Sequence, residues 1–480
     1  MHEGSASRWA RETFDTTPLG DVRRTRRLVE MAAGAARRPS GKVSAVFDKD
    51  HEREGAYDFL ENDAIAASDV AEMLFAASVE RAKAEPVAYV VVDGTSLTLT
   101  DARASKDFGP IGSPNCPARG LQVMNALGVS RHGVPLGLVD QIYWARPPRV
   151  KRTRAEAAKR NAQRPFEEKE TSNFVRAAQN AVERLARADV SAWVVIDREG
   201  DNRDILLGLA ESKCLYTVRS HWDRPTLGED GLRGPKLRQA LREEPLLGTY
   251  TIDIGRTGQR AARRATIGVH AKLVELRFAR REHKPAESLH VWAVWLREHT
   301  TDAKPLDWLL FTNAPVTNAE QAERVVESYR TRWRVEEFHR TWKQGECNVE
   351  DAQLRSMNAM VKWASILAAV ATRIERLKYL SRNKPDEPAT IELGEDEIEA
   401  LKLDQRQRRP GAKKKPRLPA VPTIAEATRW VAQLGGWIGP ANGPPGSSTL
   451  ARGMQRLGDL VAGIRLARQP SRGVRRKGIS

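Results

Sequence analysis

The chain has 480 residues and a mass of 53.5 kDa, a length that predicts about three domains or one elaborated core. It carries 79 lysines and arginines against 62 aspartates and glutamates, and this net charge of +17 favours a polyanionic partner, most simply nucleic acid. No apolar run approaches the roughly 18 residues that a membrane span needs, and the N-terminus lacks the features of a secretion signal. The three cysteines lie far apart, which argues against a disulfide framework or a structural zinc site. We therefore expect a soluble, cytoplasmic, multidomain protein without a membrane partner.

The N-terminal segment, residues 1–69, is predicted to be helical and basic. Apolar residues from Leu28 to Ala35 recur at helical spacing. Four arginines crowd the preceding turn: Arg23, Arg24, Arg26 and Arg27. They could form a merely solvated face, but their density in so basic a chain favours contact with DNA phosphates.

The next segment, residues 70–380, is predicted to form an α/β core. Ala88–Asp93 is a continuous run of mostly β-branched residues, which is typical of a fully buried strand. A hairpin, a helix and two more strands follow, at residues 121–143, 166–186, 193–197 and 215–219. This order suits a mixed sheet with one antiparallel pair.

Residues 222–307 interrupt the α/β pattern. Apolar and polar residues alternate there with a period of two, which predicts an inserted, mostly antiparallel β subdomain. Trp308–Thr312 is then expected to return to the core as a strand, followed by long helices over 318–345 and 354–379. Beyond residue 380 we expect a basic linker at 405–417 and short helices at 423–437 and 448–468.

Two acidic residues follow predicted buried strands. Asp93 comes after the first strand, and Asp197 comes after the strand that begins at Trp193. Strand ends are rigid and open onto loops, so they are good places for a ligand. A single acid there is commonly a turn former, but two acids on strands expected to be neighbours favour a site.

A third acid lies in the helix predicted over 318–345. At about 100° per residue, Tyr329, Arg332, Glu336 and Lys343 fall on one narrow face. The alternative is an exposed charged face with ion pairs three or four residues apart. Nearby tryptophan and phenylalanine side chains leave few purely solvent-facing positions, which favours a functional face.

Carboxylates without paired histidines favour hard divalent cations, Mg²⁺ or Mn²⁺, over zinc. Two such ions about 4 Å apart can activate a water and stabilise the leaving oxygen of a phosphodiester. Competing chemistries are absent, because the chain has no phosphate-binding glycine loop, no Gly-x-Ser-x-Gly elbow and no His-Glu-x-x-His motif.

The spacing Tyr-x₂-Arg-x₃-Glu-x₆-Lys at 329–343 resembles the signature of the insertion sequence four family, bacterial cut-and-paste transposases with an Asp-Asp-Glu triad. The flanks of the acids, 93–97 and 197–199, also resemble this family. So do Leu19-Gly20-Asp21 near the N-terminus and Leu434-Gly435-Gly436 near the C-terminus. The resemblance therefore extends over almost the whole chain.

The resemblance implies an RNase H-like catalytic core at 70–380, with the β insertion at 222–307. It also implies an N-terminal domain at 1–69 that binds the transposon end. The segment 381–480 would provide dimerisation and further DNA contacts. The partners would be double-stranded DNA, as terminal repeats and target, and a second copy of the chain in the synaptic complex.

The implied reaction is cut-and-paste transposition by hydrolysis, hairpin formation and strand transfer. Asp93, Asp197 and Glu336 would hold two Mg²⁺ ions, with Mn²⁺ as a substitute. The resemblance assigns phosphate contacts to Tyr329, Arg332, Lys343 and Arg219. Trp308 would stack a base flipped out of the hairpin, although a tryptophan at this position could equally belong to the core.

Two alternatives remain open. The chain could be a DNA-binding regulator derived from a transposase and lacking cleavage activity, or a structure-selective nuclease with the same core. The intact triad disfavours the first, and the terminal helical segments disfavour the second. The basic stretch 146–165 departs from the family and could be a surface loop or an extra DNA contact.

Overall fold

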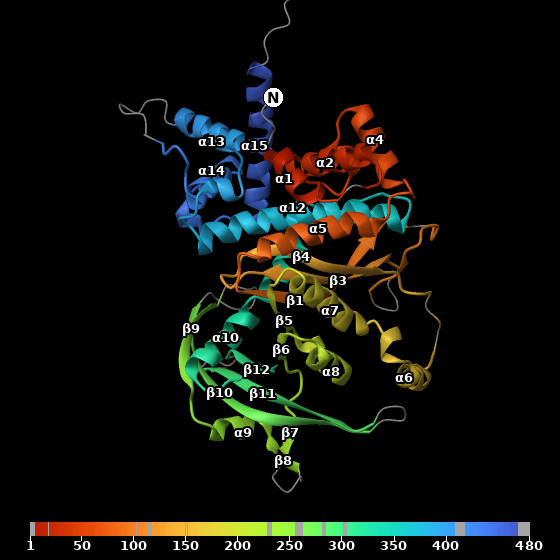
Figure 1. The fold of residues 1–480 in the computed structure, drawn as a ribbon, viewed down its shortest axis with the longest axis vertical. Coiled ribbons are helices and arrows are strands. Elements are labelled where there is room, and N and C mark those ends of the chain that lie inside the picture. Colours follow the sequence, from red (N-terminus) through yellow and green to blue (C-terminus); the bar gives the residue numbers. More distant parts are fainter. Residues whose placement is uncertain are drawn as a thin grey trace, which may run out of the picture. The chain divides into compact units, whose positions relative to one another are not determined.

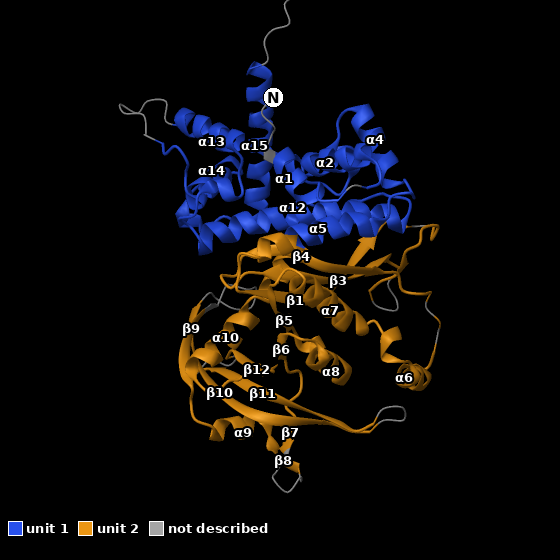
Figure 2. Ribbon diagram, in the orientation of Figure 1, with its two compact units in different colours: residues 1–77, 340–480 blue, residues 78–339 orange. Residues whose placement is uncertain are grey.

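A computed structural model describes residues 5–17, 19–101, 103–112, 117–148, 150, 152–227, 233–254, 263–280, 285–300, 305–408 and 418–468. The chain divides into two compact units (Figure 2). One unit comprises residues 78–339, and the other combines residues 1–77 with 340–480. The predicted catalytic segment 70–380 contains the whole of unit 78–339, while residues 340–380 group with the two ends of the chain.

Unit 78–339 is built on a mixed sheet, as the sequence predicts. Its described residues form ten hydrogen-bonded strands in the order β2-β3-β1-β5-β6-β12-β11-β10-β9, with β4 paired to β3 (Figure 1). The strands are β1 (Val87–Leu99), β2 (Gly109–Pro110), β3 (Arg119–Val129), β4 (Pro135–Trp144), β5 (Ser191–Ile196), β6 (Leu215–Arg219), β9 (Gly248–Ile254), β10 (Arg263–Phe278), β11 (Glu287–Glu298) and β12 (Asp307–Thr312). Only β5 runs parallel to both of its neighbours, β1 and β6.

The strands of the insertion extend this sheet and do not form a separate one. β12 pairs with β6 on one side and with β11 on the other, and β10 and β9 continue the antiparallel series. Val274, Val291 and Trp295 from these strands belong to the same buried cluster as the core strands. The insertion also holds a two-stranded sheet, β7 (Pro225–Leu227) with β8 (Arg233–Lys236), and the helix α9 (Leu237–Glu243).

One face of the central strands carries the apolar core. Val90, Val92, Val194 and Ile196 are fully or almost fully buried there. The amphipathic helix α7 (Ser172–Ala186) packs against β1, β3, β4 and β5, and its apolar residues join the same cluster, as do those of α8 (Arg203–Glu211). Because side chains alternate along a strand, Tyr89, Val91 and Asp93 point to the opposite face.

The opposite face meets the helix α10 (Ala319–Arg330), which begins where the Asn318 side chain accepts a hydrogen bond from the amide of Gln321. The prediction of one unbroken helix over 318–345 is wrong, because the chain turns at Thr331 and Arg332 before α11 (Trp333–Lys343). Hydrogen bonds here reach back three residues, as from Arg332 N to the Tyr329 carbonyl, and the Thr331 hydroxyl donates to the Ser328 carbonyl. These bonds tighten the backbone and end α10 without proline or glycine.

The other unit is helical. It contains α1 (Ser5–Phe14), α2 (Val22–Arg37), α3 (Val43–Val46), α4 (Asp50–Leu60), α12 (Met357–Asn383), α13 (Glu395–Gln407), α14 (Ile424–Leu434) and α15 (Ser447–Arg468), while α5 (Ala67–Ala82) crosses the unit boundary. Most of α12 is buried, which is typical of a central helix. No described helix is long and apolar enough to cross a membrane.

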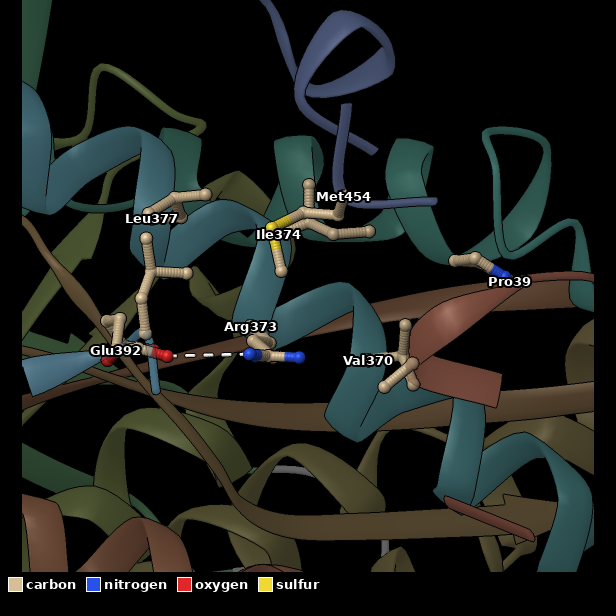
Figure 3. A pocket seen from close by; sticks show the side chains of 9 residues that line it. Pro39, Val370, Arg373, Ile374, Leu377, Glu392 and Met454 are labelled. Carbon is tan, nitrogen blue, oxygen red and sulfur yellow. Dashed lines mark hydrogen bonds between the residues drawn. The ribbon is translucent and has the colours of Figure 1, made fainter. Parts of the chain in front are cut away.

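The α13 helix was not predicted, and most of the expected basic linker, 409–417, lies outside the described residues. A small cavity beside α12 is lined by Val370, Ile374, Leu377 and Met454 and by Arg373, whose guanidinium donates to the Glu392 carbonyl (Figure 3). Its volume of about 10 Å³ holds at most one water, so we interpret it as a packing gap.

Candidate active site

The two predicted aspartates lie side by side on the α10 face of the sheet. β1 and β5 pair in parallel up to Val92 and Ile196, so Asp93 and Asp197 occupy the next position of each strand. Asp93 was expected to follow the end of its strand, but β1 continues to Leu99, paired beyond this point only with β3. Asp93 therefore lies within β1. Because β5 ends at Ile196, β1 has no partner strand on that side from Asp93 onward among the described residues.

Asp197 ends β5 and shapes the turn that follows. Its Oδ1 accepts a hydrogen bond of 2.7 Å from the amide of Glu199 and so caps the short 3-10 turn Arg198–Gly200. This turn needs a glycine at position 200, because a Cβ there would lie 2.6 Å from the Ile196 side chain. The backbone therefore fixes where the Asp197 carboxylate stands.

Glu336 lies in the first turn of α11 and faces Arg332. The Arg332 Nη1 and Glu336 Oε1 atoms are 2.7 Å apart, and only 8% of Arg332 is exposed. The same guanidinium lies 4.6 Å from the centre of the Trp333 ring. Arg332 is thus a fixed positive charge beside the third predicted acid.

Electrostatics place all three acids in one neighbourhood. Burial, and after it the charges of Asp197, Glu336 and Glu199, together raise the pKa of Asp93 to about 7. Only Arg332 opposes these effects. Burial and Asp197 likewise raise the pKa of Glu199. Several carboxylates therefore share a partly desolvated space with one guanidinium, an environment in which bound cations are favourable.

The donor set fits a hard divalent cation, since it consists of carboxylate oxygens. No group of three His, Cys, Asp or Glu side chains stands in a metal-binding arrangement within the described ranges. Glu336 is paired with Arg332, and Asp197 accepts from a backbone amide. A cation at these acids would therefore compete with Arg332 for Glu336.

The structure brings four of the predicted phosphate- and base-contacting residues together. Tyr329 is 2% exposed and meets the Trp308 ring edge-on, with 5.0 Å between ring centres. Burial raises the pKa of the Tyr329 hydroxyl, while the charges of Arg219 and Arg332 oppose the rise. Arg219 lies on the same face of β6 as Thr217, which binds α10 through the Ser328 hydroxyl at 2.9 Å.

Two predicted contacts are less accessible than the sequence implied. Trp308 is 7% exposed, so little of its ring is free to stack on a base in this state. Lys343 lies about two turns after Glu336 on α11 and belongs to the helical unit. There its amino group lies 3.9 Å from a carboxylate oxygen of Glu350.

The four N-terminal arginines lie on α2, which Asp21 caps by accepting from the amide of Arg23. Arg23 also forms an ion pair with Asp21, and Arg24 donates to the carbonyls of Leu19 and Ala64. Arg27 forms an ion pair with Glu30 at 3.3 Å. Arg26 is exposed and has no hydrogen-bond or ion-pair partner among the described residues.

Sequence reasoning missed a buried polar network beside Asp93. Asn125 stands directly opposite Asp93 in the β1–β3 pair and binds His339 of α11. Its Oδ1 accepts a hydrogen bond of 2.6 Å from Gln141, whose own oxygen accepts one from Tyr143. Asn125 and Gln141 are amides within largely buried strands, and this was the available signal.

Part of the basic stretch 146–165 is a surface helix, α6 (Arg154–Gln163), none of whose residues is buried. Thr153 and Glu156 begin it with a reciprocal capping box. Arg146 binds Glu170 with two hydrogen bonds of 2.6 and 2.5 Å, which anchors one side of the stretch.

Comparison with protein families agrees with this arrangement. Residues 6–65 match a model of a transposase DNA-binding domain, 169–373 a transposase DDE domain, and 369–473 a transposase Tn5 dimerisation domain. The DDE match includes Asp197 and Glu336, while Asp93 lies before it.

A mixed α/β sheet with a DDE domain defines a metal-dependent DNA nuclease and transferase. The order of the DNA-binding, DDE and dimerisation domains identifies the chain further. It belongs to the DDE transposases that resemble the insertion sequence four family, and it is a DNA transposase.

Proposed function

We propose that this transposase moves its element by a cut-and-paste reaction in which Asp93, Asp197 and Glu336 are the catalytic acids. The observation that supports this assignment most directly is the parallel register of β1 and β5, which sets Asp93 beside Asp197, and the charges of Asp197 and Glu336 both raise the pKa of Asp93. Acids from two adjacent strands and a helix therefore interact electrostatically, although they are far apart in sequence.

We further propose that these acids hold two Mg²⁺ ions, which Mn²⁺ can replace. Such ions, when bound, activate the attacking oxygen and stabilise the charge on the leaving oxygen. The protein supplies oxygen ligands on rigid elements: a strand interior for Asp93, a capped turn for Asp197 and the first turn of a helix for Glu336.

The proposed reaction consists of successive in-line displacements at phosphorus. Water first attacks at the element end, breaks the bond to the 3′-oxygen and releases a 3′-hydroxyl. This hydroxyl attacks a phosphodiester of the opposite strand and forms a hairpin, while the 3′-oxygen of the flanking DNA leaves with a proton. A second water then attacks the hairpin phosphate, and the 3′-hydroxyl is regenerated as the leaving group. The hydroxyl finally attacks a target phosphodiester, and the target's own 3′-oxygen leaves with a proton.

Residues around the acids would hold the DNA during these steps. Arg219 and Tyr329 lie on facing elements, β6 and α10, so together they can bind the oxygens of one phosphate. Arg332 can exchange its pairing with Glu336 for a phosphate when a cation takes Glu336. We assign a phosphate contact to Lys343 as well, and stacking on a flipped base to Trp308 once its ring becomes exposed.

The wider assembly is also part of this proposal. Residues 1–69, through the α2 arginines, would bind the terminal repeats as double-stranded DNA, and residues 381–480 would pair two chains in the synaptic complex. The second DNA partner would be the target duplex. Because its substrate is chromosomal DNA, we expect the protein to act on the bacterial nucleoid, in the cytoplasm.

The decisive experiment compares wild type with Glu336→Gln on a DNA fragment that carries the terminal repeats flanking this gene. We expect wild type to yield hairpin-ended product in Mg²⁺ and Glu336→Gln to bind equally well but not to cut. The matched control is Glu337→Gln, because Glu337 is the next residue and pairs with Arg334. Cleavage by Glu336→Gln would refute the site assignment.

The same experiment tests the regulator alternative. A regulator would bind the fragment tightly, and neither wild type nor variant would cut it in Mg²⁺ or in Mn²⁺. Cleavage without hairpin ends would leave the enzyme class intact but refute the proposed order of steps.

A further inference from the structure

The loop that follows β6 is fixed by a buried carboxylate. The Asp201 side chain is completely buried, and its Oδ2 accepts hydrogen bonds from the amides of His221 at 2.6 Å and Trp222 at 3.1 Å. The Ser220 hydroxyl lies 3.1 Å from the same oxygen and shares its single proton between this oxygen and the Trp222 carbonyl, while Arg224 forms an ion pair with the carboxylate. Charge-assisted hydrogen bonds to one buried group hold this loop in a single conformation.

Trp222 is held by its backbone while its side chain is exposed. Its carbonyl accepts a hydrogen bond of 2.8 Å from the Ser220 hydroxyl, so both of its peptide groups are engaged. The side chain is nevertheless 61% exposed, and its ring meets the His221 imidazole edge-on, with 4.4 Å between ring centres. A large apolar ring on a rigid loop is thus presented to whatever enters this site.

The Trp222 ring lines a pocket that also contains Asp197, one of the proposed catalytic acids. An open pocket of about 440 Å³ is lined by Asp197, Arg198, Glu199, Asp201, His221 and Trp222. Its lining carries the carboxylates of Asp197, Glu199 and Asp201 beside the guanidinium of Arg198. The Trp222 ring on this lining is an uncharged aromatic face, so it suits the face of a nucleobase and not a phosphate.

We propose that Trp222 is a stacking platform for a nucleobase of the DNA strand being processed, within about two nucleotides of the phosphate at the acids. This inference rests on the proposed function, because it uses Asp197 as the mark of the reacting phosphate. Trp222 then positions the strand by its base, while Arg219 and Arg332 hold it by its phosphates. Every base has an aromatic face, so the contact tolerates any sequence.

The test asks whether removing the Trp222 side chain and removing one DNA base weaken binding through the same contact. The probe is a duplex of the terminal sequence flanking this gene, already cut at its end, with one abasic site at each of several positions around the cut. Binding is measured without divalent ions, for wild type and Trp222→Ala. We expect Trp222→Ala to bind the intact probe about 10-fold more weakly, and to bind one abasic probe as well as wild type does.

Conservative and unrelated variants complete the design. Trp222→Phe should restore most of the affinity, because it keeps an aromatic face. Leu273→Ala should change nothing, since Leu273 is an exposed apolar side chain, at 52%, on β10 of the same unit. The melting temperature of Trp222→Ala should equal that of wild type, as expected for an exposed ring. A Trp222→Ala penalty that is the same for every abasic probe, or no penalty at all, overturns the inference.

The two proposals fail separately in this experiment. Wild type that cuts the uncut fragment but shows no coupling refutes the stacking role alone. Coupling in binding without any cleavage in Mg²⁺ or Mn²⁺ supports the stacking role and refutes the catalytic one. Failure of wild type to bind the probe refutes both.

Discussion

Asn125 of β3 and His339 of α11 are joined by a hydrogen bond of 2.9 Å between Nδ2 and Nε2. Because Asn125 Oδ1 accepts from Gln141, its amide nitrogen is the donor and the imidazole accepts. Asn125 lies directly across from Asp93 on the same face of the sheet, and His339 lies one turn after Glu336 on α11. The bond therefore fixes the helix that carries one acid against the strand pair that carries another.

We predict that Asn125→Leu lowers the rate of Mg²⁺-dependent cleavage by about 10- to 100-fold, because small displacements of reacting groups cost that much. DNA binding should remain, since Asn125 is fully buried and cannot touch DNA. The measurement is single-turnover cleavage beside a binding titration. Tyr143→Phe is the control, because it removes only the outermost hydrogen bond of this network. Cleavage by Asn125→Leu at the wild-type rate would contradict a positioning role.

The raised pKa of Asp93 predicts how the metal-free protein responds to pH. The folded state keeps the Asp93 proton up to about pH 7, while the unfolded state loses it near pH 3.8. The folded state thus binds more protons between these values, and the contribution of Asp93 to stability falls as pH rises through this window. Asp93→Asn removes the effect, so in chelator the variant should melt above wild type at pH 8.

The difference in melting temperature should shrink as the pH is lowered toward 4.5. At pH 8 we expect about 3 °C or more, since 1 kcal/mol shifts the melting temperature of a domain this size by about 2–4 °C. Addition of Mg²⁺ should raise the melting temperature of wild type at pH 8 and leave Asp93→Asn unchanged. A pH-independent difference between the two proteins would show that Asp93 is not buried among like charges.

The strands were predictable because their signals are local. The β-branched run at 88–92 and the alternation within 248–298 determine strand type within a few residues. The break at Thr331 and Arg332 was not predictable, because neither glycine nor proline marks it and the turn depends on Thr331 bonding back to Ser328. The continuation of β1 past Asp93 was not predictable either. Only the structure shows that β5 ends at Ile196 while β1 continues to Leu99.

The site was predictable as a set of residue types but not as an arrangement. The spacing at 329–343 predicts Arg332 and Glu336 as site residues, yet their ion pair depends on the tight turn between α10 and α11. The contact between Asn125 and His339 joins residues 214 positions apart, so only the folded chain reveals it. The position of Trp222 likewise depends on a contact that only the folded chain reveals, the hydrogen bond from its amide to Asp201. In the sequence, Asp201 cannot be told from an ordinary loop acid.

Arg26 and Arg23 differ in their surroundings on α2, and we predict that they differ in DNA binding. Arg26 is exposed and without a partner in the described part of the chain, whereas Asp21 pairs with Arg23. Arg26→Ala should lower the slope of log affinity against log salt by about 0.9, the value for one lost phosphate contact. Arg23→Ala should change the slope less. Equal slopes for wild type and Arg26→Ala would exclude this arginine from the DNA contact.

Tyr329→Phe isolates the role of one buried hydroxyl. The ring packs against Trp308 and would be kept, so the stability of the fold should change little. The hydroxyl lies beside Arg219 and Arg332, where we propose that the hairpin phosphate is held. We therefore expect the first nick at near wild-type rate and hairpin formation slowed by about 10-fold, the effect of about 1.4 kcal/mol on the barrier. Denaturing gels that resolve nicked from hairpin product over time give both rates. Equal slowing of both steps would instead mean that Tyr329 shapes the site as a whole, and unchanged rates would remove it from the phosphate contacts.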